Sequence, residues 1–165
     1  MFNRIWRAFR NDASLYGELK GNPRFASESW LIFAISIVIS AVLATLIDGN
    51  QLILGIASAL SNILGFFALV ILAWFIGAKL AGGTGSFTDI RAAVTYAYCI
   101  PAILTPVPTV GLITSLWFLV TGSSAIRETL GIGRGLTLII VIISGMVIFA
   151  IQFSAFAAFM SMGTN

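Results

Sequence analysis

The sequence contains no histidine and only one cysteine, Cys99. Without histidine there is no imidazole to hold zinc, haem or chlorophyll, and a single thiol cannot form an intrachain disulfide. Charged residues are also scarce, at 9%, whereas 59% of the residues are hydrophobic. A soluble domain of this length could not bury so much apolar surface. The composition therefore excludes a soluble globular protein, and we expect no cofactor and no metal.

Long apolar runs account for most of the chain: 30–47, 52–80, 92–107, 109–126 and 136–160. A bilayer core of about 30 Å requires about 20 apolar residues of helix, which the first, second and fifth runs provide. The third and fourth runs would reach only about 24 to 27 Å as helices and are interrupted by Pro101, Pro106 and Pro108, so two short spans and a re-entrant hairpin both remain open. The second run is long enough to tilt strongly or to begin with an interfacial turn near Gly55. We predict an all-α integral membrane bundle of about five transmembrane helices.

All nine basic residues fall in alternate gaps between these runs: Arg4, Arg7, Arg10, Lys20 and Arg24, then Lys79 and Arg91, then Arg127 and Arg134. The other gaps carry only Asp48. Because positive charge stays on the cytoplasmic side, we expect a cytoplasmic N-terminus and an external C-terminus. The predicted organisation is a cytoplasmic segment at 1–29, a transmembrane domain at 30–160 and a short external tail at 161–165. The first run is too long for a signal peptide, so we expect it to remain.

The N-terminal segment has an amphipathic helical pattern. Apolar residues recur at i, i+3, i+4 and i+7, and arginines lie on or beside the opposite face: Phe2, Ile5, Trp6 and Phe9 against Arg4, Arg7 and Arg10. Such a helix lies on the inner leaflet, where anionic lipid contributes about 1 kcal/mol per arginine. The alternative is that these residues pack on the cytoplasmic loops of the same protein. A second short helix is expected over 14–19, before the Gly21-Asn22-Pro23 break.

Polar side chains inside the runs are few, and none is ionisable at neutral pH, which argues against a coupled pump. We predict that Asn62 and Gln152 form interhelical hydrogen bonds of about 0.6 kcal/mol each. Small residues spaced by four predict close helix packing, either within one chain or between copies. The predicted helix-packing residues are Asn62, Ala73, Gly77, Ala81, Pro101, Gln152 and Ser154.

Glycine-rich segments at 82–87 and 131–135 do not match phosphate-binding motifs, because neither has the required ending or a preceding strand. They are typical of helix stops and turns, with Thr88 or Asp89 capping the third helix and Arg134 at the headgroups. We find no catalytic constellation, because no base is available to activate a serine or Cys99. The cytoplasmic acids Asp89 and Glu128 are expected to pair with the nearby cations Lys79, Arg91 and Arg127. The sequence therefore predicts a protein that is not an enzyme.

From the second run onward several motifs follow one another: Gly82-Gly83-Thr84-Gly85-Ser86-Phe87, then 91–98 leading into Pro101, then Val110-Gly111 and Trp117, then 131–136. In this order the chain resembles the Yip1-domain membrane proteins, and the resemblance covers about 22–156, including Pro23 and Phe25. The chain has Gly131-Ile132-Gly133 where the family often has a serine. It lacks the long N-terminal region and the aspartate-leucine-tyrosine-glycine motif of the eukaryotic trafficking members, so the resemblance is to short prokaryotic ones.

This resemblance implies a five-helix membrane protein with a cytoplasmic N-terminus, and it implies no reaction. We expect a non-enzymatic protein of the prokaryotic cytoplasmic (inner) membrane that organises or recruits partners as a scaffold or adaptor. Its expected partners are the lipid bilayer and other membrane proteins, either copies of itself or a larger complex, and no nucleic acid. Two alternatives remain: an accessory subunit of a respiratory or photosynthetic complex, and a small-solute transporter or channel.

Overall fold

Helices make up all of the regular structure in the described part of the chain. The computed structural model describes residues 1–47 and 52–162, except for the side chains of Leu54, Phe149 and 151–162. The predictions made for Asp48, Gln152 and Ser154 therefore concern a residue or side chains outside the described part of the chain. The elements are α1 (Phe2–Phe9), α2 (Ser14–Leu19), α3 (Pro23–Ile47), α4 (Leu52–Leu72), the π-helix η1 (Ala73–Leu80), α5 (Phe87–Leu104), α6 (Pro108–Leu130) and α7 (Arg134–Met162).

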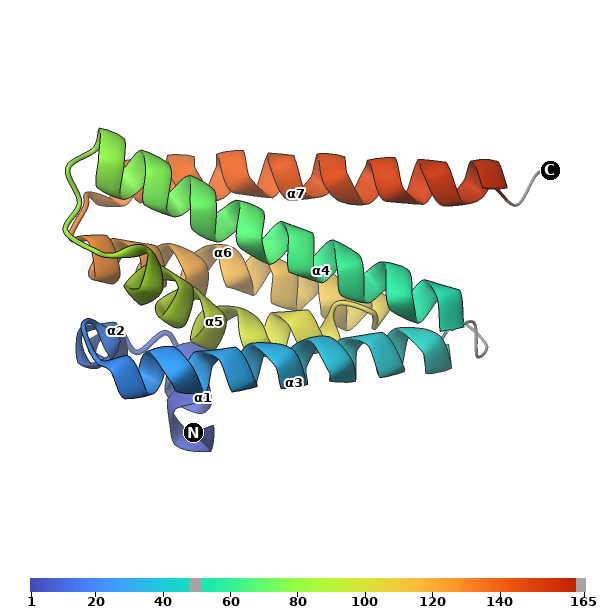
Figure 1. Cartoon of the computed structure of the whole chain (residues 1–165), viewed down its shortest axis with the longest axis horizontal. Coiled ribbons are helices and arrows are strands. Elements are labelled where there is room, and N and C mark those ends of the chain that lie inside the picture. The colour runs from blue at the N-terminus through green and yellow to red at the C-terminus, as the bar shows by residue number, and fades with distance from the viewer. Residues whose placement is uncertain (48–51, 163–165) are drawn as a thin grey trace.

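The five long helices α3 to α7 run along one another and reverse direction at each turn, while α1 lies across the bundle beside α3 (Figure 1). The helix ends and turns that carry the basic residues gather at or beside the left-hand end in this view, together with α2. We call this the basic end. The last helix ends at the opposite end of the bundle. The fold therefore brings together cations that are up to 130 positions apart in the chain, from Arg4 to Arg134.

Three helices within the described residues are long and apolar enough to cross a membrane: Pro23–Ile47, Gly55–Leu80 and Pro108–Leu130. The described part of α7 adds a shorter apolar helix, Arg134–Ile148. The helices extend beyond the apolar runs in the sequence. Thus α3 begins seven residues earlier, at Pro23, and α6 continues to Leu130. Polar first and last turns lengthen these helices because their ends lie where water and headgroups are available.

Helix α5 occupies the centre of the bundle. Every residue from Ile90 to Ala97 is buried. It packs against α3 and α6, and α1 and α2 cover it near the basic end. One core cluster joins α3 to α7 around Phe33 and Phe66, whose ring centroids are 4.3 Å apart. A second cluster joins α1 and α2 to α5 around Tyr16 and Tyr96. The N-terminal helices are therefore part of the same packed body.

The chain turns sharply between η1 and α5. The Gly83 N–H donates to Gly77 O over 2.9 Å, and the Thr84 N–H donates to Leu130 O over 3.0 Å. Gly82 has φ +71°, which a residue with a side chain rarely adopts. Ser86, and not Thr88 or Asp89, is the N-cap of α5, because Asp89 completes the reciprocal capping box from the third helical position. The glycine-rich segment is thus a helix stop and turn, as its composition predicted.

The long second run does not begin with an interfacial turn. Helix α4 starts at Leu52 and passes through Gly55 without a break. A Cβ atom on Gly55 would lie 2.1 Å from Thr45 Oγ1 of α3. Glycine is required here because the two helices approach closely, and α4 is inclined to α3 and α7 in Figure 1. The extra length of the run is accommodated by this inclination and by the π-helix at its end.

Candidate functional site

Helices α1 and α2 are joined by a network around the Arg7 side chain. Arg7 donates to Asp12 Oδ2 over 2.7 Å and to Glu18 Oε1 over 2.8 Å. Asp12 Oδ1 also accepts from the Ser14 hydroxyl over 2.6 Å, and these contacts lower the pKa of Asp12 to about 2. The pKa of Glu18 is also lowered, because its carboxylate accepts from Arg7. The two short helices therefore form one ion-paired unit.

Helix α1 attaches to the bundle by one face and leaves another exposed. Ala8 is fully buried, and Ile5 packs against the cluster that α2 forms with α5. Phe2 is 80% exposed and Trp6 is 49% exposed. The Phe9 carbonyl accepts a hydrogen bond from Trp117 Nε1 of α6 over 2.8 Å. The predicted apolar stripe is thus divided between a contact with the bundle and an exposed aromatic edge.

The predicted surface arginines have different environments. Arg4 is ion-paired with Glu28 of α3, and its guanidinium lies 4.6 Å from the Phe25 ring. Arg7 belongs to the network described above, whereas Arg10 is exposed. Two of the three cations that we expected to face lipid therefore bind carboxylates of the same chain. Helix α1 thus has exposed residues that suit lipid contact, and others, Arg4 and Arg7, that contact the same protein.

Arg91 is the most deeply buried cation of the described residues. It is 4% exposed and donates to Ser29 Oγ over 2.9 Å and to Ala26 O over 2.8 Å. Its guanidinium also lies 4.1 Å from the Trp30 ring. The expected partner Asp89 instead accepts from the Gly21 N–H over 2.8 Å. Among the described residues Arg91 contacts neutral groups only, so it fastens α5 to α3 without an ion pair, whereas Arg127 pairs with Glu128 as expected.

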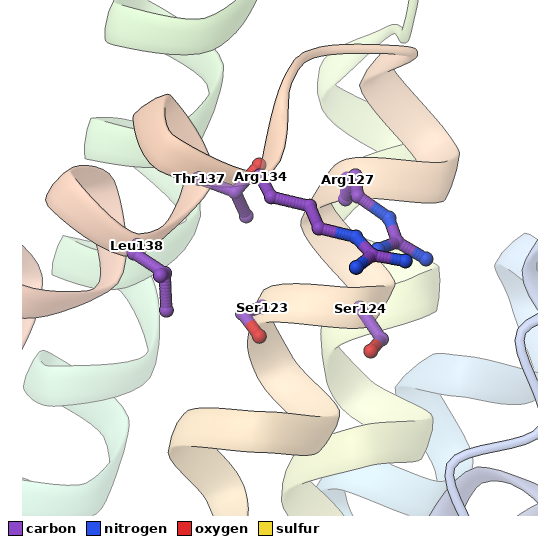
Figure 2. Close-up of a pocket in the computed structure, with 6 residues that line it drawn as sticks. All are labelled: Ser123, Ser124, Arg127, Arg134, Thr137 and Leu138. Carbon is purple, nitrogen blue, oxygen red and sulfur yellow. The ribbon is translucent and has the colours of Figure 1, made fainter.

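A small pocket opens between the end of α6 and the start of α7. It has a volume of about 110 Å³ and is lined by Ser123, Ser124, Arg127, Arg134, Thr137 and Leu138. Figure 2 shows the Arg134 side chain reaching from α7 toward the side of the pocket where Arg127 lies, with the two serines below. Arg134 is exposed and forms no ion pair among the described residues. We call this the arginine pocket.

A second cavity lies deeper in the bundle, between α4, α5, α6 and α7, with a volume of about 260 Å³. Asn62 and Tyr98 contribute its polar edge, and the Tyr98 hydroxyl donates to Asn62 Oδ1 over 2.6 Å. Asn62 Nδ2 donates to Ser40 Oγ over 3.3 Å and to Ser58 O over 3.0 Å. Asn62 is 3% exposed, and its hydrogen bonds link α4 to α3 and α5. We call this the inner cavity; Pro101 also lines it.

The predicted small-residue face is continuous only in part. Ala73 and Gly77 are buried, and a Cβ substituent on Gly77 would meet the Leu130 side chain at 2.3 Å. Ala81 is exposed. The reason is the π-helix, in which the Ala81 N–H donates to Ile76 O, five residues back. Because hydrogen bonds of this length change the number of residues per turn, a spacing of four no longer keeps residues on one face.

Ser123, Ser124 and Thr137 were not selected from the sequence, although they line the arginine pocket. The available signal was their spacing. Ser123 precedes Arg127 by one helical turn, and Thr137 follows Arg134 by three residues, so each hydroxyl shares a helix face with an arginine. The sequence does not indicate that these two faces meet, because that depends on how α6 packs against α7.

These features define a helical membrane protein with a basic end and an apolar body. A Yip1 domain family profile matches residues 6–156. The chain therefore belongs to the Yip1 domain family, and the resemblance found in the sequence is confirmed. No curated protein and no solved structure is significantly similar to the chain.

Proposed function

We propose that this Yip1-family chain is a non-enzymatic, five-span membrane protein that organises or recruits partner proteins at the membrane. In this proposal the basic end faces the cytoplasm and the C-terminus is external, as the positive-inside rule predicts. The prokaryotic inner membrane is its proposed location. One observation carries the proposal: α1 is fastened to the bundle, yet it exposes Phe2 and Trp6.

A short helix that is held in place can present aromatic side chains with little loss of conformational entropy on binding. Aromatic residues bordered by arginine are common at the centres of protein interfaces. The ion pair between Arg4 and Glu28 and the Trp117 hydrogen bond to Phe9 O hold α1 against α3 and α6. The exposed edge of α1 is therefore suited to bind a membrane partner from the side, at the depth where the long helices leave the lipid.

Site-specific photocrosslinking tests this role. A photoreactive amino acid replaces Trp6 in the full chain, in native membranes, and the matched control replaces Leu31, an exposed apolar residue of α3. We expect a defined protein adduct from position 6 that is absent from position 31. Substituting Phe2 and Trp6 by alanine should then abolish copurification of that partner and leave thermal stability in detergent unchanged.

Three other results would contradict or change the recruitment role of α1. If position 6 gives only lipid adducts, as position 31 should, then α1 serves as a membrane anchor and the recruitment role is wrong. Adducts that contain only a second copy of this chain would replace a hetero-partner with self-association. Stable copurification with one large respiratory or photosynthetic complex would favour the accessory-subunit alternative.

The inner cavity favours a second candidate function, the small-solute transporter or channel. It reaches Asn62 and Tyr98, two polar residues within the bundle. Reconstituted vesicles that show solute flux, lost when Gly145 at the cavity wall is replaced by leucine, would support transport. Vesicles that are no more permeable with the protein than without it would eliminate this candidate.

A further inference from the structure

The arginine pocket and the inner cavity lie on the same seam between α6 and α7. On α6, Ser123 and Arg127 line the pocket, and Ser115 and Leu119 line the cavity. These residues are spaced by four, so they form a single stripe along the helix. About 18 Å of helix, at about 1.5 Å per residue, separates Ser115 from Arg127. The stripe is charged at the basic end and becomes mostly apolar toward the middle of the bundle.

The facing stripe of α7 follows the same order. Arg134 and Leu138 line the pocket, whereas Val141 and Gly145 line the cavity. Their spacing of four and three also keeps them on one helix face. A Cβ atom added to Gly145 would meet nothing within 4 Å, so the seam is open at this depth. The arginine pocket and the inner cavity thus lie along one seam between the two helices. This seam is basic at one end and apolar inside the bundle.

The charges in the arginine pocket favour the binding of an anion. Arg127 is ion-paired with Glu128, but Arg134 has no carboxylate partner among the described residues. These three groups leave a net charge of about +1. Arg134 also stands in the first turn of α7, where the helix dipole is itself positive and disfavours a cation. A bound monoanion would neutralise this net charge and offset the unfavourable interaction between Arg134 and the helix dipole. Guanidinium and hydroxyl donors also match the oxygens of a phosphodiester.

We propose that the seam between α6 and α7 binds one anionic phospholipid. Its phosphodiester lies in the arginine pocket, with the Ser123 and Ser124 hydroxyls nearby, and one acyl chain enters the inner cavity. Basic pockets between membrane helices on the cytoplasmic side are suited to anionic headgroups. The separation of about 18 Å is similar to the depth of one leaflet of the hydrocarbon core, about 15 Å. A free phosphate would leave the apolar half of the seam without a ligand.

Native mass spectrometry of the full chain tests this proposal. The protein is released from nanodiscs that contain equal amounts of phosphatidylglycerol and phosphatidylcholine, and the bound lipids are counted. We expect wild-type protein to retain phosphatidylglycerol preferentially. Arg134→Gln should reduce this preference about tenfold, as expected for the loss of one charge-assisted contact. Arg24→Gln, which removes an exposed cation from the same end of the bundle, should leave the preference unchanged.

A second variant addresses the acyl chain. Gly145→Leu fills open space in the cavity wall, so it should weaken retention of both lipids while the preference for the anionic one persists. Glycerophosphoglycerol, the headgroup without chains, should not compete at concentrations equal to that of the lipid. These two results together distinguish a lipid from a free anion.

Three outcomes would overturn the proposal. Equal effects of Arg134→Gln and Arg24→Gln would mean that only overall charge attracts the lipid. Competition by the soluble headgroup, with no effect of Gly145→Leu, would replace the lipid with a free phosphodiester. Equal retention of both lipids by wild-type protein would remove the headgroup site. None of these results depends on whether α1 recruits a partner.

Discussion

Helices α3 and α5 lie side by side in the bundle, yet their surroundings differ. Along its length α3 exposes large apolar side chains, among them Leu31, Ile35 and Val38. In α5 every residue from Ile90 to Ala97 is buried, and this stretch contains alanine, threonine, tyrosine and arginine. The outward face of α3 is thus covered by lipid in our proposal, whereas α5 is covered by protein.

This difference shows what hydropathy measures in a membrane bundle. A side chain in contact with lipid must be apolar, because hydrocarbon offers no hydrogen-bond partners. A central helix meets other helices instead, and small residues allow the close approach from which its packing energy comes. Hydropathy therefore reports contact with lipid more than depth in the membrane. That is why α5, the most enclosed helix, corresponds to one of the weaker apolar runs in the sequence.

The largest expected effect comes from enlarging a small residue on each helix. Ala97→Leu places three extra carbon atoms in a packed site of α5 and should destabilise the protein by about 1–3 kcal/mol. Ala34→Leu, on the exposed face of α3, should have almost no effect. Thermal unfolding in detergent measures both variants. Equal stabilities for the two would mean that α5 is not enclosed.

Removing a cation from each helix should have a smaller effect. Arg91→Ala loses two hydrogen bonds and the contact with Trp30, partly offset by the desolvation that the buried charge no longer requires. A net loss of about 1 kcal/mol is expected. The exposed Arg24 of α3 provides the control, since Arg24→Ala should be neutral. Should Arg91→Ala match or exceed wild-type stability, the buried cation does not contribute to joining the helices.

Two tyrosines of α5 sharpen the comparison within one helix. Tyr98→Phe removes the donor to Asn62 Oδ1 and should destabilise the protein by about 0.6 kcal/mol. The Tyr96 hydroxyl lies beside Arg4 and Glu28 but completes no hydrogen bond of normal geometry among the described residues, so Tyr96→Phe should cost less than Tyr98→Phe. Parallel melting curves of the two variants decide this point, and a larger loss from Tyr96→Phe would contradict it.

The smallest expected effect concerns the cover that α1 and α2 provide over α5. The pKa values of Asp12 and Glu18 are lowered in the folded protein by contacts with Ser14 and Arg7. Their stabilising contribution is therefore complete above the ordinary carboxyl range near pH 4 and is lost as pH falls toward about 2. The protection factors of the α1 and α2 amides, which correct for the intrinsic pH dependence of hydrogen exchange, should fall over this interval.

Arg7→Gln serves as the control for this titration. It removes the shared cation, so the protection factors of the α1 and α2 amides should be lower near pH 6 and should change less on acidification. The long helices should retain their protection in both proteins, because their described contacts do not involve these carboxylates. A wild-type protein whose α1 and α2 amides do not respond to pH would show that the network does not hold the two helices together.

Much of this architecture could be predicted from the sequence. The apolar runs indicated membrane helices, and the break at Gly21-Asn22-Pro23 correctly ended a short helix at Leu19. The spacing of Ala73 and Gly77 indicated a buried face, but the π-helix then turned Ala81 to the outside. Such a change in helix geometry depends on how the neighbouring turn packs against Leu130, which no local sequence pattern contains.

The candidate sites were harder to predict because they combine residues from different helices. Arg134 was expected at the headgroups from its position alone, but its place beside Arg127 depends on the turn between α6 and α7. Arg91 was expected to pair with an acid and instead contacts Ser29, Ala26 and Trp30 of α3. A buried cation binds the acceptors and aromatic rings that the packing brings near, so its partners are determined by the fold.

By itself the sequence determined that this chain is a helical membrane protein with its cations in alternate gaps, because the exclusion of charge from hydrocarbon acts on each segment separately. Only the tertiary structure decided that α5 is enclosed, that α1 is fastened across the bundle, and that Arg127 and Arg134 meet at the head of an open seam. These features result from contacts between distant segments, which depend on packing geometry and not on the composition of any single helix.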